Sequence, residues 1–374
     1  SAAAVTQIIL NGNLDSTDGD AAANGGIINL NSANIDLTTT VTLDSDDDAG
    51  TDGAITIGNA AGNALDANAA GTEGLNIRAG GGTLTVNSDM GNTTALGAID
   101  VDATGTVNWN GDIQTRNAAV NFQGVTGTIT VTGNDNTDFV IDTSDANGTA
   151  GDILFNTSST ITANDRNLTF NATSFNASND GDVTLPGTIT LTTGNLDVDG
   201  ETITVNAITT GGGNVDLNAD ASDLDPAGAD IVFSGSLIDT TAGGTTGAGS
   251  ISLTSGGNDD TMNLTSNLTL RTAGAGNDDA GITIGLQLDA TANETLTINA
   301  DDGGGDGDGD VDINAALGGS GVLGLLDINA DQVTIDSNID ALGIRVTAQT
   351  SIDIDGAAVL DINGVDSYFE SASI

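Results

Sequence analysis

The densest group of side chains able to bind a metal ion lies between residues 301 and 312, where aspartate repeatedly follows glycine. Carboxylates spaced in this way can curl around one hard cation, and calcium takes six to eight oxygen ligands. The segment does not match the helix-loop-helix calcium motif, because Val311 and Leu317 occupy its Gly and Glu positions. The prediction is a calcium site, calcium being the only cofactor expected, and the alternative is a solvated acidic loop. The candidate ligands are Asp301, Asp302, Asp306, Asp308, Asp310 and Asp312.

Paired carboxylates can also perform general acid–base catalysis, as in glycoside hydrolases. A β-helical, polysaccharide-active enzyme is therefore one interpretation of the many aspartates. The rest of the composition argues against it. The chain has no His, only five basic residues, all of them Arg, and 2% aromatic residues on which sugars could stack. The sequence predicts a protein that is not an enzyme.

The formal net charge of -48 limits the possible partners. A chain with so few cations cannot neutralise the phosphates of nucleic acid, and an anionic membrane surface would repel it. Cysteine is absent, and no run of 18 apolar residues is long enough to span a membrane. The start, Ser1 followed by three alanines, is typical of a mature N-terminus after removal of a signal peptide. We expect an extracellular or cell-surface location.

Short strands are predicted along the whole chain, because apolar and polar residues alternate in triplets punctuated by Gly, Asn and Asp. About three dozen such units occur, roughly one per ten residues, and no window has a helical pattern. We predict an all-β fold, a single-stranded parallel β-helix (β-solenoid) with coils of unequal size, continuous over residues 1–374, with loop insertions near 243–249 and 301–310. Clear examples of the triplets are 28–30, 55–57, 84–86, 107–109, 129–131, 168–170, 203–205, 215–217, 251–253, 296–298, 311–313, 333–335 and 352–354.

Asparagine often follows the triplet, which suggests a role at the corners of the coils. Asn tolerates left-handed backbone geometry, and stacked Asn amides can form hydrogen bonds from one coil to the next. We therefore expect left-handed backbone geometry and a ladder of Asn amides at the corners of the coils. The positions are Asn11, Asn31, Asn87, Asn110, Asn156, Asn171, Asn206, Asn218, Asn299, Asn314, Asn329 and Asn363.

Thr-x-Thr triplets raise a further possibility, a flat ice-binding face. Such a face requires one triplet per coil in register, and the intervals between these triplets are irregular. The sequence therefore favours ordinary outward-facing threonines. The triplets are 83–85, 128–130, 188–190, 202–204 and 295–297.

Several segments resemble the repeats of filamentous-haemagglutinin-type adhesins, among them Gly151-Asp-Ile-Leu-Phe-Asn156, Asn167-Leu-Thr-Phe-Asn-Ala172 and Leu326-Asp-Ile-Asn-Ala330. The resemblance covers nearly the whole chain, although the secretion domain of that family is not recognisable. It implies a right-handed β-helix with a role at the cell surface or in a biofilm matrix. The composition, rich in Asp, Thr, Gly, Asn and Ala, is also similar to that of bacterial surface-layer proteins.

No amphipathic capping helix is predicted at either terminus, so both ends of the solenoid would present unpaired strand edges. Such ends favour head-to-tail stacking of copies, a contact that generates filaments. We expect a structural subunit of an extracellular filament or matrix fibre, whose partners are copies of itself, with strand addition at the contact. Cell-surface glycans or other matrix components are further expected partners. The alternatives are a surface-layer subunit and a stalk segment of a larger adhesin.

Overall fold

The structure is a computed structural model, and it describes most of the chain with gaps between the strands. The described residues are 7–17, 25–32, 34–47, 51–59, 63–132, 138–144, 149–174, 180–219, 229–241, 247–255, 260–274, 279–301, 309–364 and 367–371. They contain 38 β-strands and no helix. They divide into two compact units, Ser1–Gly187 (unit 1) and Thr188–Ile374 (unit 2). The continuity of one solenoid across both units stays a prediction.

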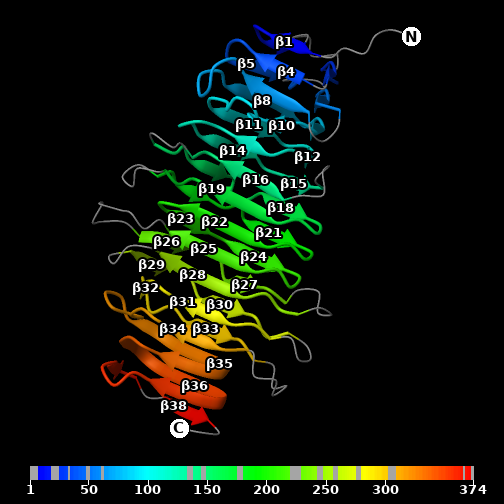
Figure 1. The fold of residues 1–374 in the computed structure, drawn as a ribbon. Helices are drawn as coiled ribbons and strands as arrows, with labels where there is room; N and C mark the ends of the chain where they lie inside the picture. Colours follow the sequence, from blue (N-terminus) through cyan, green and yellow to red (C-terminus); the bar gives the residue numbers. More distant parts are fainter. Residues whose placement is uncertain are drawn as a thin grey trace. The chain divides into compact units, whose positions relative to one another are not determined.

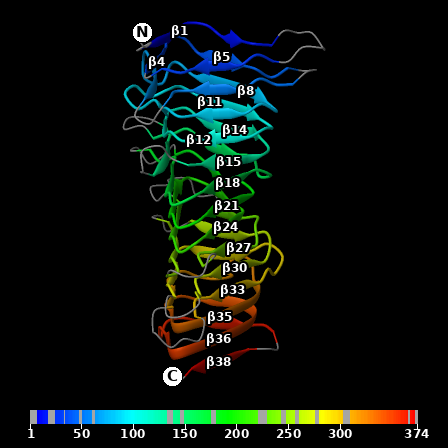
Figure 2. The same cartoon turned by 90° about the vertical axis from the view of Figure 1, so that its right-hand side faces the viewer.

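Unit 1 is built from three stacks of parallel strands, which the chain visits in turn (Figures 1 and 2). Stack A holds β3 (Ile28–Leu30), β6 (Ile55–Ile57), β9 (Leu84–Val86), β12 (Val107–Trp109), β15 (Thr128–Val131) and β18 (Thr160–Ala163). Stack B holds β1 (Ile8–Leu10), β4 (Asn34–Leu37), β7 (Ala64–Ala67), β10 (Asp89–Met90), β13 (Ile113–Gln114), β16 (Phe139–Asp142) and β19 (Leu168–Asn171). Stack C holds β2 (Leu14–Asp15), β5 (Val41–Asp44), β8 (Leu75–Gly80), β11 (Ile99–Ala103), β14 (Val120–Val125), β17 (Ile153–Phe155) and β20 (Val183–Thr184).

Unit 2 repeats the three stacks, and its last two long strands turn corners and so contribute to more than one stack. Stack A holds β21 (Thr188–Leu191), β24 (Ala207–Thr210), β27 (Leu237–Asp239), β30 (Leu268–Arg271), β33 (Leu296–Asn299), parts of β35 (Leu323–Ile335) and β36 (Ile339–Ile354), and β38 (Tyr368–Ser371). Stack B holds β22 (Leu196–Gly200), β25 (Val215–Ala219), β28 (Ile251–Ser255), β31 (Ile282–Ile284) and β34 (Val311–Ile313), then the ends of β35 and β36. Stack C holds β23 (Ile203–Val205), β26 (Ala229–Phe233), β29 (Thr261–Leu264), β32 (Gln287–Ala290), the start of β36 and β37 (Leu360–Ile362).

The strand register confirms a parallel β-helix with coils of unequal size. Leu84 pairs with Val107, 23 residues further along the chain, whereas Val215 pairs with Ile251, 36 residues further along. The two predicted insertions fall between strands, since β27 ends at Asp239 before β28 begins, and β33 ends before β34. Residues 243–246 and 302–308 themselves lie outside the described part of the chain.

The core of each unit consists of the inward-facing aliphatic residues of the three stacks. In β6, for example, Ile55 and Ile57 are fully buried while Thr56 between them is partly exposed. Burying each such side chain contributes about 1.5–3 kcal/mol. Successive coils place the same kind of residue in the same column, so the inward apolar surface of each interior coil is covered by the coils on either side.

Buried hydroxyl groups close the loops that leave the coils. The Ser45 hydroxyl donates a hydrogen bond of 2.9 Å to the carbonyl of Gly53, and the Thr240 hydroxyl donates one of 2.6 Å to the carbonyl of Gly249. Both donors are fully buried, and each acceptor lies where its loop returns to the column. An unsatisfied buried carbonyl would cost about 1–3 kcal/mol, so these bonds allow loops of different length to leave the core undisturbed.

The Asn amide ladder is confirmed at two corners. The Asn110 amide donates to Asn87 at 2.9 Å, and the Asn329 amide donates to Asn299 at 3.2 Å. The left-handed backbone expected at the Asn corners is wrong for the described positions. The non-glycine residues with positive φ in the described chain are Asn117, Asp165 and Asn293, none of which follows a strand triplet.

Candidate functional site

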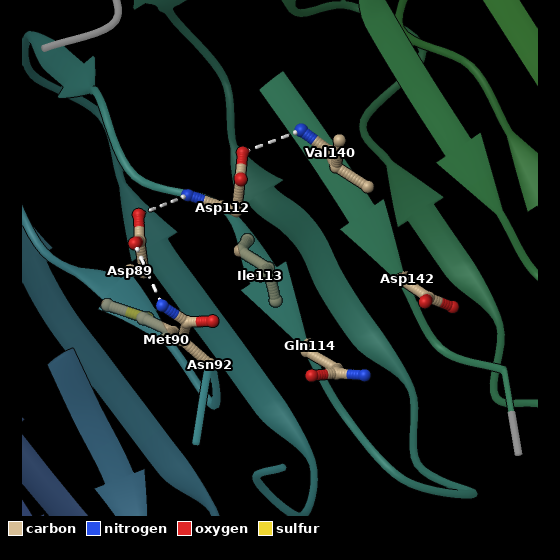
Figure 3. A pocket seen from close by; sticks show the side chains of 8 residues that line it. All are labelled: Asp89, Met90, Asn92, Asp112, Ile113, Gln114, Val140 and Asp142. Carbon is tan, nitrogen blue, oxygen red and sulfur yellow. Dashed lines mark hydrogen bonds between the residues drawn. The ribbon is translucent and has the colours of Figure 1, made fainter. Parts of the chain in front are cut away.

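A shallow hollow of about 210 Å³ lies on the outer surface of unit 1, over β10, β13 and β16 of stack B (Figure 3). These neighbouring strands place three aspartates around it. The hollow is smaller than the 300–1,000 Å³ typical of small-molecule sites. Its lining residues are Asp89, Met90, Asn92, Asp112, Ile113, Gln114, Val140 and Asp142.

The carboxylates of this hollow already accept backbone hydrogen bonds. Asp89 accepts one from the N–H of Asp112 at 3.2 Å, and Asp112 accepts one from the N–H of Val140 at 2.9 Å (Figure 3). Each carboxylate therefore bridges its own coil to the next one. The side chain of Asp142 caps the loop that follows it, accepting a bond of 2.9 Å from the N–H of Ser144. The geometry gives these aspartates a structural task.

In the sequence, the predicted calcium ligands follow β33 of unit 2 and extend into β34. Asp301 is buried, and its carboxylate accepts a hydrogen bond of 2.7 Å from the Gln349 amide. Asp310 precedes β34, and Asp312 is the partly exposed middle residue of that strand. Asp302, Asp306 and Asp308 lie outside the described residues. No group of three or more acidic side chains in the described ranges is arranged to hold a metal ion. The calcium site stays a prediction.

Arg78 and Arg271 each pair with an aspartate in the neighbouring coil. Arg78 lies 3.5 Å from Asp102, and Arg271 lies 3.6 Å from Asp239. Both pairs occupy directly opposed register positions. The sequence predicts scattered arginines but not these partners, because each pair joins residues of different coils.

Most outward aspartates of stack B in unit 2 are separated by neutral residues. Asp312 lies between Thr283 and Thr334 in the column of paired residues, whereas Asp197 lies directly opposite Asp216. Partial burial raises the pKa of Asp197, and the negative charges of Asp199 and Asp216 raise the pKa of the same carboxyl further. Neutral neighbours therefore lower the repulsion between most aspartates of this stack.

The raised pKa of Asp197 predicts a stabilising substitution. A carboxyl whose pKa is higher in the folded state holds its proton more strongly there, so its ionisation lowers the free energy of unfolding as pH rises. We expect Asp197→Asn to raise the free energy of unfolding at pH 7 by about 1 kcal/mol or less, since half-exposed charges are screened. Urea titrations should show the gain disappearing near pH 3, below the ordinary Asp range. Asp312→Asn, with threonine neighbours, is the matched control, and an equal gain in both variants would contradict this explanation.

The exposed large apolar side chains of the described residues are confined to the first coil of unit 1 and the last two coils of unit 2. Their exposed fractions range from 37% at Ile354 to 73% at Ile27. The full set is Ile9, Ile27, Leu342, Ile354, Val359 and Tyr368. Ile9 and Ile27 could be recognised in the sequence. Each stands next to another isoleucine, Ile8 or Ile28, at a position where the alternation predicts a polar residue.

The same coils have strand edges without a described partner. The first coil of unit 1, formed by β1, β2 and β3, pairs on one side only, with β4, β5 and β6. In unit 2, β37 and β38 pair only with β36. Unpaired backbone groups beside exposed apolar side chains form a surface to which a further strand can be added.

The described residues contain no helix that is both long and apolar enough to cross a membrane. Comparisons of this chain with protein-family models, with curated proteins and with solved structures find no match.

Proposed function

We propose that the chain is a non-catalytic structural subunit of an extracellular filament or matrix fibre. In this proposal the last coil of one copy pairs with the first coil of the next. The observation that carries it is that, among the described residues, exposed large apolar side chains are restricted to the first coil and the last two coils, and the first and last coils also have open strand edges.

The three stacks give the contact a defined geometry. The end of β36 would pair with β1 of the next copy, β37 with β2, and β38 with β3, so each stack would continue in register. The hydrogen-bonded edge then supplies affinity, and the apolar side chains are removed from water. The formal net charge of -48 opposes any such contact, so assembly is expected to need salt or divalent cations.

Negative-stain microscopy of the purified chain at raised ionic strength tests the proposal. We expect fibres from the wild type and isolated particles from the double variant Ile27→Asp/Val359→Asp, because each new carboxylate would be buried at the contact. Thr38→Asp/Thr39→Asp adds the same charge at an exposed corner of the second coil and should leave the fibres intact. Wild-type particles that stay single at every salt concentration, or fibres from the double variant, would refute the proposal. Fibres that dissolve in a chelator would support bound calcium.

A stalk segment of a larger adhesin, or a tile in a surface layer, is the second candidate. The same open edges suit it, because further coils of a longer chain can cover them as well as a second copy can. Particles that stay single for this chain, with further coils seen only when a longer chain is imaged, would favour the stalk. Flat lattices in the micrographs would favour the surface layer.

A further inference from the structure

Outward-facing threonines of stack A in unit 1 form a regular array over four successive coils. The central residues of β9, β12, β15 and β18 lie in register: Thr85 pairs with Asn108, Asn108 with Thr130, and Thr130 with Thr162. A second column of threonines lies two residues earlier: Thr83 and Thr106 come directly before β9 and β12, and Thr128 pairs with Thr160 in β15 and β18.

The irregular spacing of these triplets in the sequence is absorbed elsewhere in the coils. Asn108 and Thr130 are 22 residues apart, whereas Thr130 and Thr162 are 32 apart, yet both pairs are adjacent. The additional residues of the longer coil lie between β15 and β16 and between β16 and β17. The structure therefore brings the triplets of three of these coils, 83–85, 128–130 and 160–162, into one face, with Thr106-Val-Asn108 between the first two.

This face carries no charge. No charged residue occurs in the four strands and their flanks, 81–87, 104–110, 126–132 and 158–164, although the chain has 53 acidic residues. The seven threonines of the array are exposed or partly exposed. Within the described part of the protein, none of their hydroxyls has a hydrogen-bond partner, so each is free to bind water.

A row of hydrogen bonds holds the edge of the array. The Asn110 amide donates to Asn87 in the previous coil at 2.9 Å, and Asn110 accepts a hydrogen bond from the Thr132 hydroxyl in the next coil. This ladder runs beside the two threonine columns. It fixes neighbouring coils relative to one another, which keeps the hydroxyl positions ordered.

The dimensions of the face favour a repeating partner over a second copy of the chain. Four strands about 4.8 Å apart, with three outward positions about 6.7 Å apart along each strand (the two threonine columns and the ladder beside them), give a face of about 400 Å². A stable protein interface needs about 800 Å² from each partner, twice that area. A rigid two-dimensional lattice of hydroxyls and methyls, without charge, instead suits a crystalline surface of water, whose repeat distances on the prism faces of hexagonal ice are similar.

We propose that the face formed by β9, β12, β15 and β18 binds ice. Ordered water held by the hydroxyls would join the ice lattice, and the methyl groups between them would exclude disordered water. The ligand class is crystalline water. This binding does not depend on filament assembly, so it can be measured on unassembled protein at low ionic strength.

Ice recrystallisation and the shape of single ice crystals provide the test. The wild type should slow recrystallisation and produce faceted crystals, and Thr130→Tyr, in the middle of the array, should lower the potency by about tenfold or more. Thr283→Tyr is the control, because Thr283 is also a partly exposed central strand residue but lies between Ser252 and Asp312. Circular dichroism checks that both variants fold. If Thr130→Tyr does not fold, Thr106→Lys on the exposed column replaces it.

A wild type without effect on ice growth at any soluble concentration would overturn the proposal, as would equal losses in Thr130→Tyr and Thr283→Tyr. Sedimentation distinguishes the other possible occupant. A Thr130→Tyr variant that loses mass relative to the wild type, with no ice activity in either, would make this face a contact between copies and would also overturn the proposal.

Discussion

Phe155→Ala is expected to lower the free energy of unfolding of unit 1 by about 3–5 kcal/mol, the usual cost of a large cavity in a core. The Phe155 side chain is 1% exposed and stacks on Phe122, with ring centroids 5.1 Å apart and an interplanar angle of 6°. Its other neighbour is Phe170, with a centroid distance of 5.3 Å. The Trp109 ring packs edge-on against Phe122 at 5.1 Å. Removing Phe155 therefore interrupts an aromatic cluster shared by all three stacks.

Urea unfolding followed by Trp109 fluorescence measures this loss, because the chain has one Trp and it belongs to the same cluster. Tyr368→Ala is the control. Tyr368 is 48% exposed, so its removal should cost less than about 1 kcal/mol. Similar losses in the two variants would show that the cluster does not stabilise the column.

Gly82→Ala is expected to destabilise unit 1 by about 3 kcal/mol or more, because overpacking against backbone cannot be relieved by a rotamer change. A Cβ atom on Gly82 would lie 2.0 Å from the carbonyl oxygen of Gly53 in the preceding coil. The column continues in both directions: a Cβ on Gly53 would meet the Gly26 oxygen at 1.9 Å, and one on Gly105 would meet the Gly82 oxygen at 2.3 Å. These corners require glycine because the backbones of successive coils approach one another so closely.

Gly12→Ala is the matched control, since a Cβ at Gly12 has no atom within 4 Å. Thermal unfolding should show a large fall in Tm for Gly82→Ala and little change for Gly12→Ala. Equal Tm values would mean that the coils can separate at this corner without cost, contrary to the close stacking.

The strands themselves could be predicted from the sequence, because period-two alternation is a local property. Every triplet quoted for the prediction lies within a strand, including Val107–Trp109 as β12 and Val311–Ile313 as β34. The register could not be predicted, because coils range from 18 residues, between Leu326 and Ile344, to 36 residues. Loops of variable length hide which triplets become neighbours.

The same limit applies to the candidate sites. The threonine array, the Arg78–Asp102 pair and the carboxylates that bridge coils at Asp89 and Asp112 all join residues that are 20 or more positions apart. The corner glycines show the limit most clearly. Gly53 and Gly82 look like ordinary turn residues, and only the stacked coils reveal that a Cβ would collide with backbone.

Engineered cysteines test the central claim, in-register stacking of one copy on the next, most directly. Ile9 is the exposed central residue of β1, and Asp353 is an exposed residue near the end of β36. In adjacent paired strands their Cα atoms would lie about 4.8 Å apart, within the range that a disulfide bridges. The chain has no native cysteine, so any cross-link comes from the engineered pair.

Mild oxidation of Ile9→Cys/Asp353→Cys followed by denaturing electrophoresis should give a ladder of covalent multimers. Each single variant should stop at a dimer. A double variant that remains monomeric under conditions in which fibres form would contradict in-register stacking of copies.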